Sequence, residues 1–189
     1  MQQVALTSQL LFRLLAVGQI PEKIALLHGR DCLATTVLQH CVNWKNDERC
    51  AFCATQISLE KNTTIARKTP GQLAEVARSA AATDGVGHVV LTSGTGDPPG
   101  SEILYLAECT AAIKAAVTLP VHVQFLPPDD LGLIDCLKAA GVDTVMLGDD
   151  VATQKGMVMR PETWREFLKP GLAAAIKAGT VLDFETNPV

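Results

Sequence analysis

Short apolar runs rich in β-branched residues recur along the chain and are separated by segments with helical periodicity. Runs of this length, bounded by Gly, Pro, Asn and Asp, are typical of buried β-strands. Four strands are predicted, and the segment "TVLDF" close to the end predicts a fifth. The four strands are Leu33–His40, His88–Ser93, Val121–Leu126 and 143–148.

The segments between these strands carry helix start and stop signals. Thr69 is a predicted N-cap, Pro70 stands at the first helical position, and Gln72 completes a capping box. Ser101 is predicted to cap the helix "EILYLAECTAAIKAAV", and Gly141 to end the helix "DDLGLIDCLKAA" in the left-handed conformation. The stretch "PETWREFLKPGLAAAIKAG" also reads as helical.

Alternation of strands and helices predicts parallel strands joined by right-handed crossovers. The predicted strands are continuously apolar, as expected when both faces of a sheet are covered. We therefore expect an α/β protein, a partial (β/α) barrel with parallel strands and four to five βα units. Its active site should lie where strands end and helices begin. A doubly wound open sheet is the alternative, which periodicity alone does not exclude.

Size and charge narrow the class of protein. A chain of 189 residues is long enough to bury the core of one domain. The net charge of -4, without a basic stripe, argues against a general nucleic-acid binder. The apolar segment "MQQVALTSQLLFRLLAVGQIPEK" lacks a basic start, is interrupted by Arg13 and is too mixed to span a bilayer. We expect a cytoplasmic protein with no membrane or nucleic-acid partner.

The chain contains six cysteines, and three of them lie within thirteen residues. In a reducing compartment disulfides are rare, so clustered cysteines more often bind a metal or take part in chemistry. The clustered residues are Cys41, Cys50 and Cys53. The other three, Cys32, Cys109 and Cys136, are scattered among apolar residues and are predicted to pack as small hydrophobic side chains.

Three thiolates in one loop suit a [4Fe–4S] cluster in which one iron remains open for a small molecule. Zinc is the competing interpretation, because His40 beside Cys41 could complete a site of three cysteines and one histidine. His40 could equally be a packed core histidine, and three unligated thiols are a further alternative. All these interpretations remain open at the level of residue types and spacing.

Unusual polar loops follow each of the predicted strands. The cysteine loop follows the first strand, "TSGTGD" the second, "QFLPPDD" the third and "GDD" the fourth. The carboxyl ends of parallel strands meet at one edge of a sheet, so these loops should lie together. N-capping residues at helix starts would produce part of the same pattern.

The stretch "CAFCATQISLEKNTTIARKTPGQLAEVA" resembles a radical S-adenosylmethionine (SAM) subfamily of unknown reaction, often encoded near a nitrilase. The similarity runs from about residue 29 to about residue 145, with the thiols, "ARKTP" and "VVLTSGT" in the same order. It implies a [4Fe–4S] cluster on Cys41, Cys50 and Cys53, with SAM bound to the open iron. The implied activity is reductive cleavage of SAM to start radical chemistry on an unknown small-molecule substrate. Ferredoxin or flavodoxin would supply the electron.

The resemblance also assigns SAM-binding positions. Phe52 stands in the C-x-aromatic-C end of the radical SAM motif, and Ser93, Gly94 and Thr95 stand at the end of the second strand. The family often has Gly-Gly-Glu at the latter position, where the Glu receives the SAM amino group. A carboxylate is therefore missing here unless Asp97 substitutes for it.

Two further features bear on these assignments. Eight residues separate Cys41 from Cys50, whereas the family's usual motif is C-x3-C-x2-C. Gly94 and Gly96 would let the backbone approach a ligand closely, or they would simply form a turn.

Residues 147–178 are similar to a segment of the uroporphyrinogen decarboxylase superfamily, whose members are also (β/α) barrels. The similarity implies that Asp149, Asp150 and Gln154 lie at a pocket edge, whereas a solvated loop is the simpler reading. The superfamily's other catalytic segments are not found in this sequence. The alternatives to a radical SAM enzyme are thus a barrel fragment of that superfamily and a non-catalytic truncated or chimeric protein.

The resulting domain prediction has three parts. Residues 1–30 form an N-terminal helical extension, residues 31–146 a radical SAM-like core, and residues 147–189 a decarboxylase-like βα segment that is a fusion or a truncated end. An incomplete parallel sheet leaves an open edge strand, and a second copy of the chain could cover it.

Overall fold

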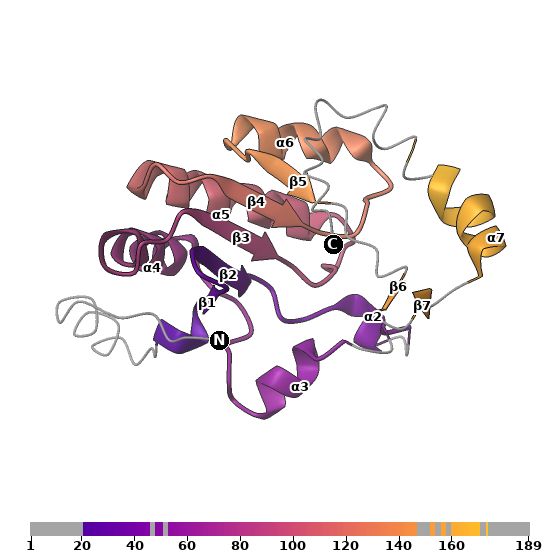
Figure 1. Cartoon of the computed structure of the whole chain (residues 1–189), viewed down its shortest axis with the longest axis horizontal. Coiled ribbons are helices and arrows are strands. Elements are labelled where there is room, and N and C mark those ends of the chain that lie inside the picture. Colours follow the sequence, from indigo (N-terminus) through magenta and orange to yellow (C-terminus); the bar gives the residue numbers. More distant parts are fainter. Residues whose placement is uncertain are drawn as a thin grey trace.

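The protein, seen here as a computed structural model, is described for residues 21–45, 48–50, 53–146, 152–153, 156–157, 160–170 and 173 (Figure 1). A five-stranded sheet in the order β1-β2-β3-β4-β5 forms its centre. β1 is antiparallel to β2, and the other neighbouring pairs are parallel. The strands are β1 (Leu26–His28), β2 (Cys32–Thr36), β3 (His88–Thr92), β4 (Val121–Gln124) and β5 (Thr144–Met146).

Three helices connect the parallel strands. They are α4 (Pro70–Thr83), α5 (Ser101–Ala116) and α6 (Ile134–Ala139). α5 contacts both α4 and α6, so the three helices lie side by side along the sheet (Figure 1). The sheet order follows the chain order, without the reversal that marks a doubly wound sheet. The α/β class is confirmed, whereas the described strands do not show closure into a barrel.

Shorter elements complete the described chain. The hairpin of β6 and β7 is antiparallel. These elements are η1 (Pro21–Lys23), α2 (Val42–Lys45), α3 (Thr55–Glu60), η2 (Leu131–Leu133), β6 (Ala152–Thr153), β7 (Gly156–Met157), α7 (Pro161–Thr163) and η3, a π-helix (Trp164–Leu168). Among the residues of the described ranges, no helix is long and apolar enough to cross a membrane.

Burial alternates along the strands, which corrects the expectation that both sheet faces are covered. Leu33, Val89, Leu91, Val121 and Val123 point into the core shared with α4 and α5. The residues between them point to the opposite face and are only half-buried. Because the helices lie along one side of the sheet, continuous apolar sequence here does not mean two covered faces. The half-buried residues include Cys32, Thr36, His88, Thr92, His122 and Gln124.

Two of the three predicted helix signals are confirmed. The capping box of α4 is formed: Thr69 Oγ1 accepts from Gln72 N at 3.3 Å, and Thr69 N donates to Gln72 Oε1 at 2.7 Å. Gly141 follows α6 with a φ of 86°, in the left-handed region. The prediction for Ser101 is wrong. Gly100 is the N-cap of α5, and Ser101 is its first helical residue without a capping hydrogen bond.

The described residues of the N-terminal extension and the end of β2 differ from their predicted elements. The described residues of the N-terminal extension form η1 and β1 rather than an α-helix, because buried Leu27 packs into the core beside β2. β2 ends at Thr36, four residues earlier than predicted, since Leu38 pairs instead with Arg67. The predicted fifth strand lies outside the described residues. The described part of the C-terminal helical stretch is helical, as predicted.

Candidate functional site

The cysteine loop and the loop after β3 lie side by side at the carboxyl edge of the sheet. Thr36 and Thr92, the last residues of β2 and β3, are paired in register. Beyond them, Gly94 N donates to Leu38 O at 2.9 Å, and Val42 N donates to Thr95 O at 3.0 Å. The segment predicted to bind SAM is thus hydrogen-bonded to the segment that carries Cys41.

The close approach of these two loops explains why residue 94 is a glycine. A Cβ added to Gly94 would lie 2.4 Å from the carbonyl oxygen of His40 and 3.1 Å from Cys41 Cβ. A Cβ added to Gly96 would lie 2.2 Å from Ser101 Oγ. The two glycines therefore allow neighbouring parts of the chain to approach, where the sequence left a ligand or a turn as the alternatives.

The loop after β3 is held by a buried carboxylate that the sequence analysis did not identify. Glu102, only 2 % exposed, lies in the first turn of α5. Its Oε2 accepts hydrogen bonds from Gly96 N at 3.0 Å and Gly100 N at 2.9 Å. A carboxylate near a helix N-terminus is also favoured by the helix dipole. Glu102 therefore positions this loop from within the helix that follows it.

The three clustered cysteines differ in their surroundings. Cys41 and Cys53 are half-buried, Cys50 is exposed, and all three thiols are free. Cys53 N donates to Cys50 O at 3.0 Å, so the backbones of these two cysteines lie close to each other. Among the described residues, no group of three or more His, Cys, Asp or Glu residues is close enough together to hold a metal ion. The three sulfurs are thus on one loop but are not gathered into a formed site.

Cys53 has surroundings that favour a thiolate. Trp44 Nε1 donates to Cys53 Sγ at 3.3 Å, and Thr55 Oγ1 lies 3.1 Å from the same sulfur. Burial raises the pKa of this thiol, but the hydrogen bonds from Thr55 and Trp44 outweigh burial, and the net pKa is lowered. Thiolates are the sulfur ligands of iron and zinc, and hydrogen bonds to the sulfurs tune iron–sulfur clusters. In donor type the loop fits the predicted cluster.

The other residues predicted for the site are at the surface, hydrogen-bonded within their own loop, or outside the described residues. Ser93 Oγ donates to Gly94 O at 2.9 Å. Asp97, the candidate substitute for the missing Glu, is exposed and lies 3.7 Å from Lys45 Nζ in a surface ion pair. His40, the candidate fourth zinc ligand, is exposed rather than packed in the core. Four predicted positions lie outside the described residues: Phe52, Asp149, Asp150 and Gln154.

The scattered cysteines show how burial affects a thiol. Cys109 is fully buried in the core, as predicted for a small hydrophobic side chain, and burial raises its pKa to about 12. Cys32 is half-buried, and its pKa is raised by burial and by the nearby charge of Asp31. Cys136 is also half-buried. These three thiols are separate from the cysteine loop.

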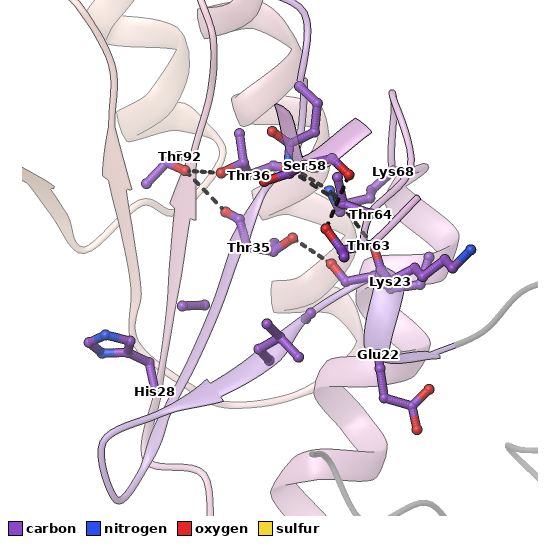
Figure 2. Close-up of a pocket in the computed structure, with 15 residues that line it drawn as sticks. Glu22, Lys23, His28, Thr35, Thr36, Ser58, Thr63, Thr64, Lys68 and Thr92 are labelled. Atoms are coloured by element: carbon purple, nitrogen blue, oxygen red, sulfur yellow. Dashed lines mark hydrogen bonds between the residues drawn. The ribbon is translucent and has the colours of Figure 1, made fainter. Parts of the chain in front are cut away.

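A cavity of about 460 Å³ lies at the β1–β2 side of the sheet, and the sequence analysis missed it (Figure 2). Its lining combines a buried lysine, Lys68, with side chains from β2, β3 and the segment around α3. Six of the lining residues carry hydroxyl groups: Thr35, Thr36, Ser58, Thr63, Thr64 and Thr92. Lys68 belongs to the "ARKTP" segment, but the sequence analysis assigned no role to this lysine.

Lys68 is 1 % exposed and its ammonium group contacts neutral acceptors. Nζ donates to Thr36 O at 2.6 Å, to Thr64 Oγ1 at 2.8 Å and to Ile65 O at 3.4 Å. Burial lowers the pKa of Lys68 to about 8, because desolvation disfavours the charged form. The side chain joins the end of β2 to the segment that leads into α4.

The lowered pKa of Lys68 should appear in the pH dependence of stability. Its ordinary pKa of 10.5 applies to the unfolded chain, so between about 8 and 10.5 the unfolded state binds more protons and stability rises with pH. From about pH 7 to pH 9.5, we expect the free energy of unfolding to rise by about 2 kcal/mol relative to Lys68→Met. Urea denaturation of both chains measures the difference.

The comparison with Lys68→Met isolates the lysine. Thiols that ionise in this pH range, and the raised pKa of Cys109, contribute equally to both chains and cancel in the difference. Lost hydrogen bonds in the variant shift its stability by an amount that does not depend on this titration. Parallel stability profiles for the two chains would show that Lys68 has an ordinary pKa.

Neither the protein-family models nor the curated proteins compared with this sequence give a match.

Proposed function

We propose that the chain is a radical SAM protein that binds a [4Fe–4S] cluster through Cys41, Cys50 and Cys53. The observation that carries the proposal is the contact between the cysteine loop and the loop after β3. Gly94, one of the positions assigned to SAM, lies directly against Cys41 and is hydrogen-bonded to Leu38. Residues assigned to cluster and cosubstrate thus come from adjacent strand ends. When bound, the cluster supplies the electron for reductive cleavage of SAM.

The thiol surroundings support cluster binding. Cys53 accepts a hydrogen bond from Trp44, only three residues after Cys41, so the two ends of the cysteine loop lie close to each other. The exposed Cys50 follows the long spacer that departs from the usual motif. The hydrogen bond from Cys53 N to Cys50 O keeps the backbones of these two cysteines close to each other. Binding would require this loop to bring all three sulfurs onto one cluster.

We also propose that the sheet belongs to a (β/α) barrel. Strand order that follows chain order, with crossover helices lying side by side, is the arrangement of a barrel segment. On this proposal the half-buried face would be the barrel interior. Thr36, Thr92 and Gln124 end three neighbouring parallel strands on that face. An unknown small-molecule substrate would bind there, and a ferredoxin or flavodoxin would reduce the cluster.

Anaerobic reconstitution with iron and sulfide tests the proposal. We expect a brown protein with broad thiolate-to-iron absorbance near roughly 400 nm. Alanine at Cys41, Cys50 or Cys53 should abolish stable loading, because two thiolates hold the cluster poorly. Cys136→Ala, at a half-buried thiol outside the loop, is the matched control and should load normally. Tight zinc uptake without iron would instead support a zinc site and overturn the cluster assignment.

Enzymatic activity needs a separate measurement. The loaded and reduced protein should release 5'-deoxyadenosine from SAM, even slowly and without substrate, and Cys53→Ala should release none. Chromatography of the quenched mixture measures the product. A cluster that loads and reduces normally but releases no 5'-deoxyadenosine would contradict the enzyme assignment, leaving a cluster-binding relative without turnover.

A further inference from the structure

The cavity beside Lys68 contains a buried positive charge without a counter-charge. The three acceptors of the Lys68 ammonium are two carbonyl oxygens and one hydroxyl oxygen. Within the part of the chain that the structure describes, no carboxylate forms an ion pair with Lys68. Lysines this deeply buried are nearly always paired, because an uncompensated charge is costly away from water. A negatively charged group in the cavity would compensate this charge.

A second buried polar group in the same cavity, the side-chain oxygen of Gln39, lacks a hydrogen-bond donor. Gln39 lines the cavity and is 8 % exposed, and its Oε1 accepts no hydrogen bond in the described structure. Its amide orientation is held by a hydrogen bond from Nε2 to Thr64 Oγ1 at 3.3 Å. Because a buried acceptor without a donor costs free energy, a donor from a ligand would stabilise this site.

The lining sets the size and polarity of the occupant. A volume of about 460 Å³ lies in the range of small-molecule pockets and greatly exceeds a single ion. In Figure 2, hydroxyl side chains approach from two parts of the chain, with Thr35, Thr36 and Thr92 on the strands and Ser58, Thr63 and Thr64 around α3. Thr36 and Thr92 are also hydrogen-bonded to each other at 2.7 Å.

We propose that this cavity binds a small hydroxylated organic carboxylate. The carboxylate would lie beside Lys68, a ligand hydroxyl would donate to Gln39 Oε1, and the threonine hydroxyls would bond the remaining polar groups. Glu22, which also lines the cavity, disfavours a multiply charged anion. The site uses none of the three clustered cysteines, so it does not depend on the proposed cluster.

Calorimetric titration of the full chain with gluconate, sorbitol, acetate and inorganic phosphate tests the proposal. Gluconate offers a carboxylate with hydroxyl groups, sorbitol lacks the charge, acetate lacks the hydroxyls, and phosphate is an anion without carbon. Gluconate should bind most tightly of the four. If sorbitol bound as tightly as gluconate, the ligand would not need a negative charge. If acetate or phosphate bound as tightly as gluconate, the ligand would not need hydroxyl groups on a carbon chain. Either result would overturn that part of the proposal. No binding of gluconate would overturn the whole.

Two variants assign the contacts. Lys68→Met should weaken gluconate binding by about tenfold or more, because it removes the positive charge that attracts the ligand carboxylate. Gln39→Leu keeps the lysine and its hydrogen bonds, so it tests the site even if Lys68→Met fails to fold. It should weaken gluconate binding and leave the weaker acetate binding unchanged. Wild-type gluconate affinity in Gln39→Leu would contradict the assignment of Gln39 Oε1.

Discussion

Gly94→Ala should lower the free energy of unfolding by about 3 kcal/mol, the upper part of the usual range for overpacking a tight contact. The added Cβ would lie 2.4 Å from the carbonyl oxygen of His40, which is backbone and cannot rotate away. Hydrogen bonds from Gly94 N to Leu38 O and from Val42 N to Thr95 O hold the two loops at this separation. The loops would have to move apart, taking Cys41 with them. Urea denaturation measures the loss.

Gly71→Ala is the matched control. Apart from its chain neighbours and the backbone of its own helix, no atom lies within 4 Å of a Cβ added to Gly71, which is an exposed residue of α4. Alanine has the higher helix propensity, so the control should be neutral or more stable by up to about 1 kcal/mol. On the proposed function, Gly94→Ala should also lower iron loading while Gly71→Ala leaves it unchanged. Equal stabilities of the two variants would mean that the loops separate at no cost.

Glu102→Ala should also destabilise the protein by about 3 kcal/mol, because it leaves two backbone N–H groups without their charged acceptor. These groups, Gly96 N and Gly100 N, both donate to Glu102 Oε2. The expected loss of stability includes the favourable interaction between the Glu102 carboxylate and the dipole at the start of α5. Thermal or urea denaturation measures it, and hydrogen exchange at Gly96 and Gly100 should become faster.

Two control variants separate the hydrogen bonds from other effects. Glu102→Gln keeps an acceptor oxygen without the charge and should lose less, about 1 kcal/mol. Glu108→Ala removes an exposed carboxylate from the same helix and should change stability by no more than about 0.5 kcal/mol. If Glu102→Ala lowered the free energy of unfolding as little as Glu108→Ala, the loop after β3 would not depend on this buried carboxylate.

Local signals in the sequence predicted the elements that depend on neighbouring residues. The start of α4 was predicted from Thr69, Pro70 and Gln72, because a capping box involves only residues three positions apart. Gly141 was predicted to follow α6 for a similar reason, since a left-handed residue suits glycine in any tertiary context. The capping role of Ser101 was wrong, because a buried side chain one residue later, Glu102, bonds the loop instead.

The candidate site also combines features that the sequence predicted with features that only the tertiary structure shows. Consecutive parallel strands must end at one edge, so the sequence predicted that the cysteine loop and the loop after β3 would be neighbours. The need for a glycine at position 94 could not be predicted. It arises from the close approach of Gly94 to the backbone of His40, which is more than fifty residues away in the chain. The hydrogen bond from Trp44 to Cys53 likewise could not be predicted, because these residues are nine positions apart in the chain.

By itself, the sequence determined the α/β class, the alternation of parallel strands and helices along the described chain, and the edge at which the cysteine loop and the loop after β3 meet. Those features follow from residue periodicity and from the geometry of parallel strands. Only the tertiary structure decided which sheet face is half-buried and which side chains form the cavity beside Lys68. Lys68, Gln39 and Thr64 approach one another because the segment before α4 is hydrogen-bonded to the segment that follows β2, with Gln39 N donating to Ala66 O and Lys68 N to Val37 O. Burial of a lysine and its lowered pKa depend on this packing, which residue order alone does not specify.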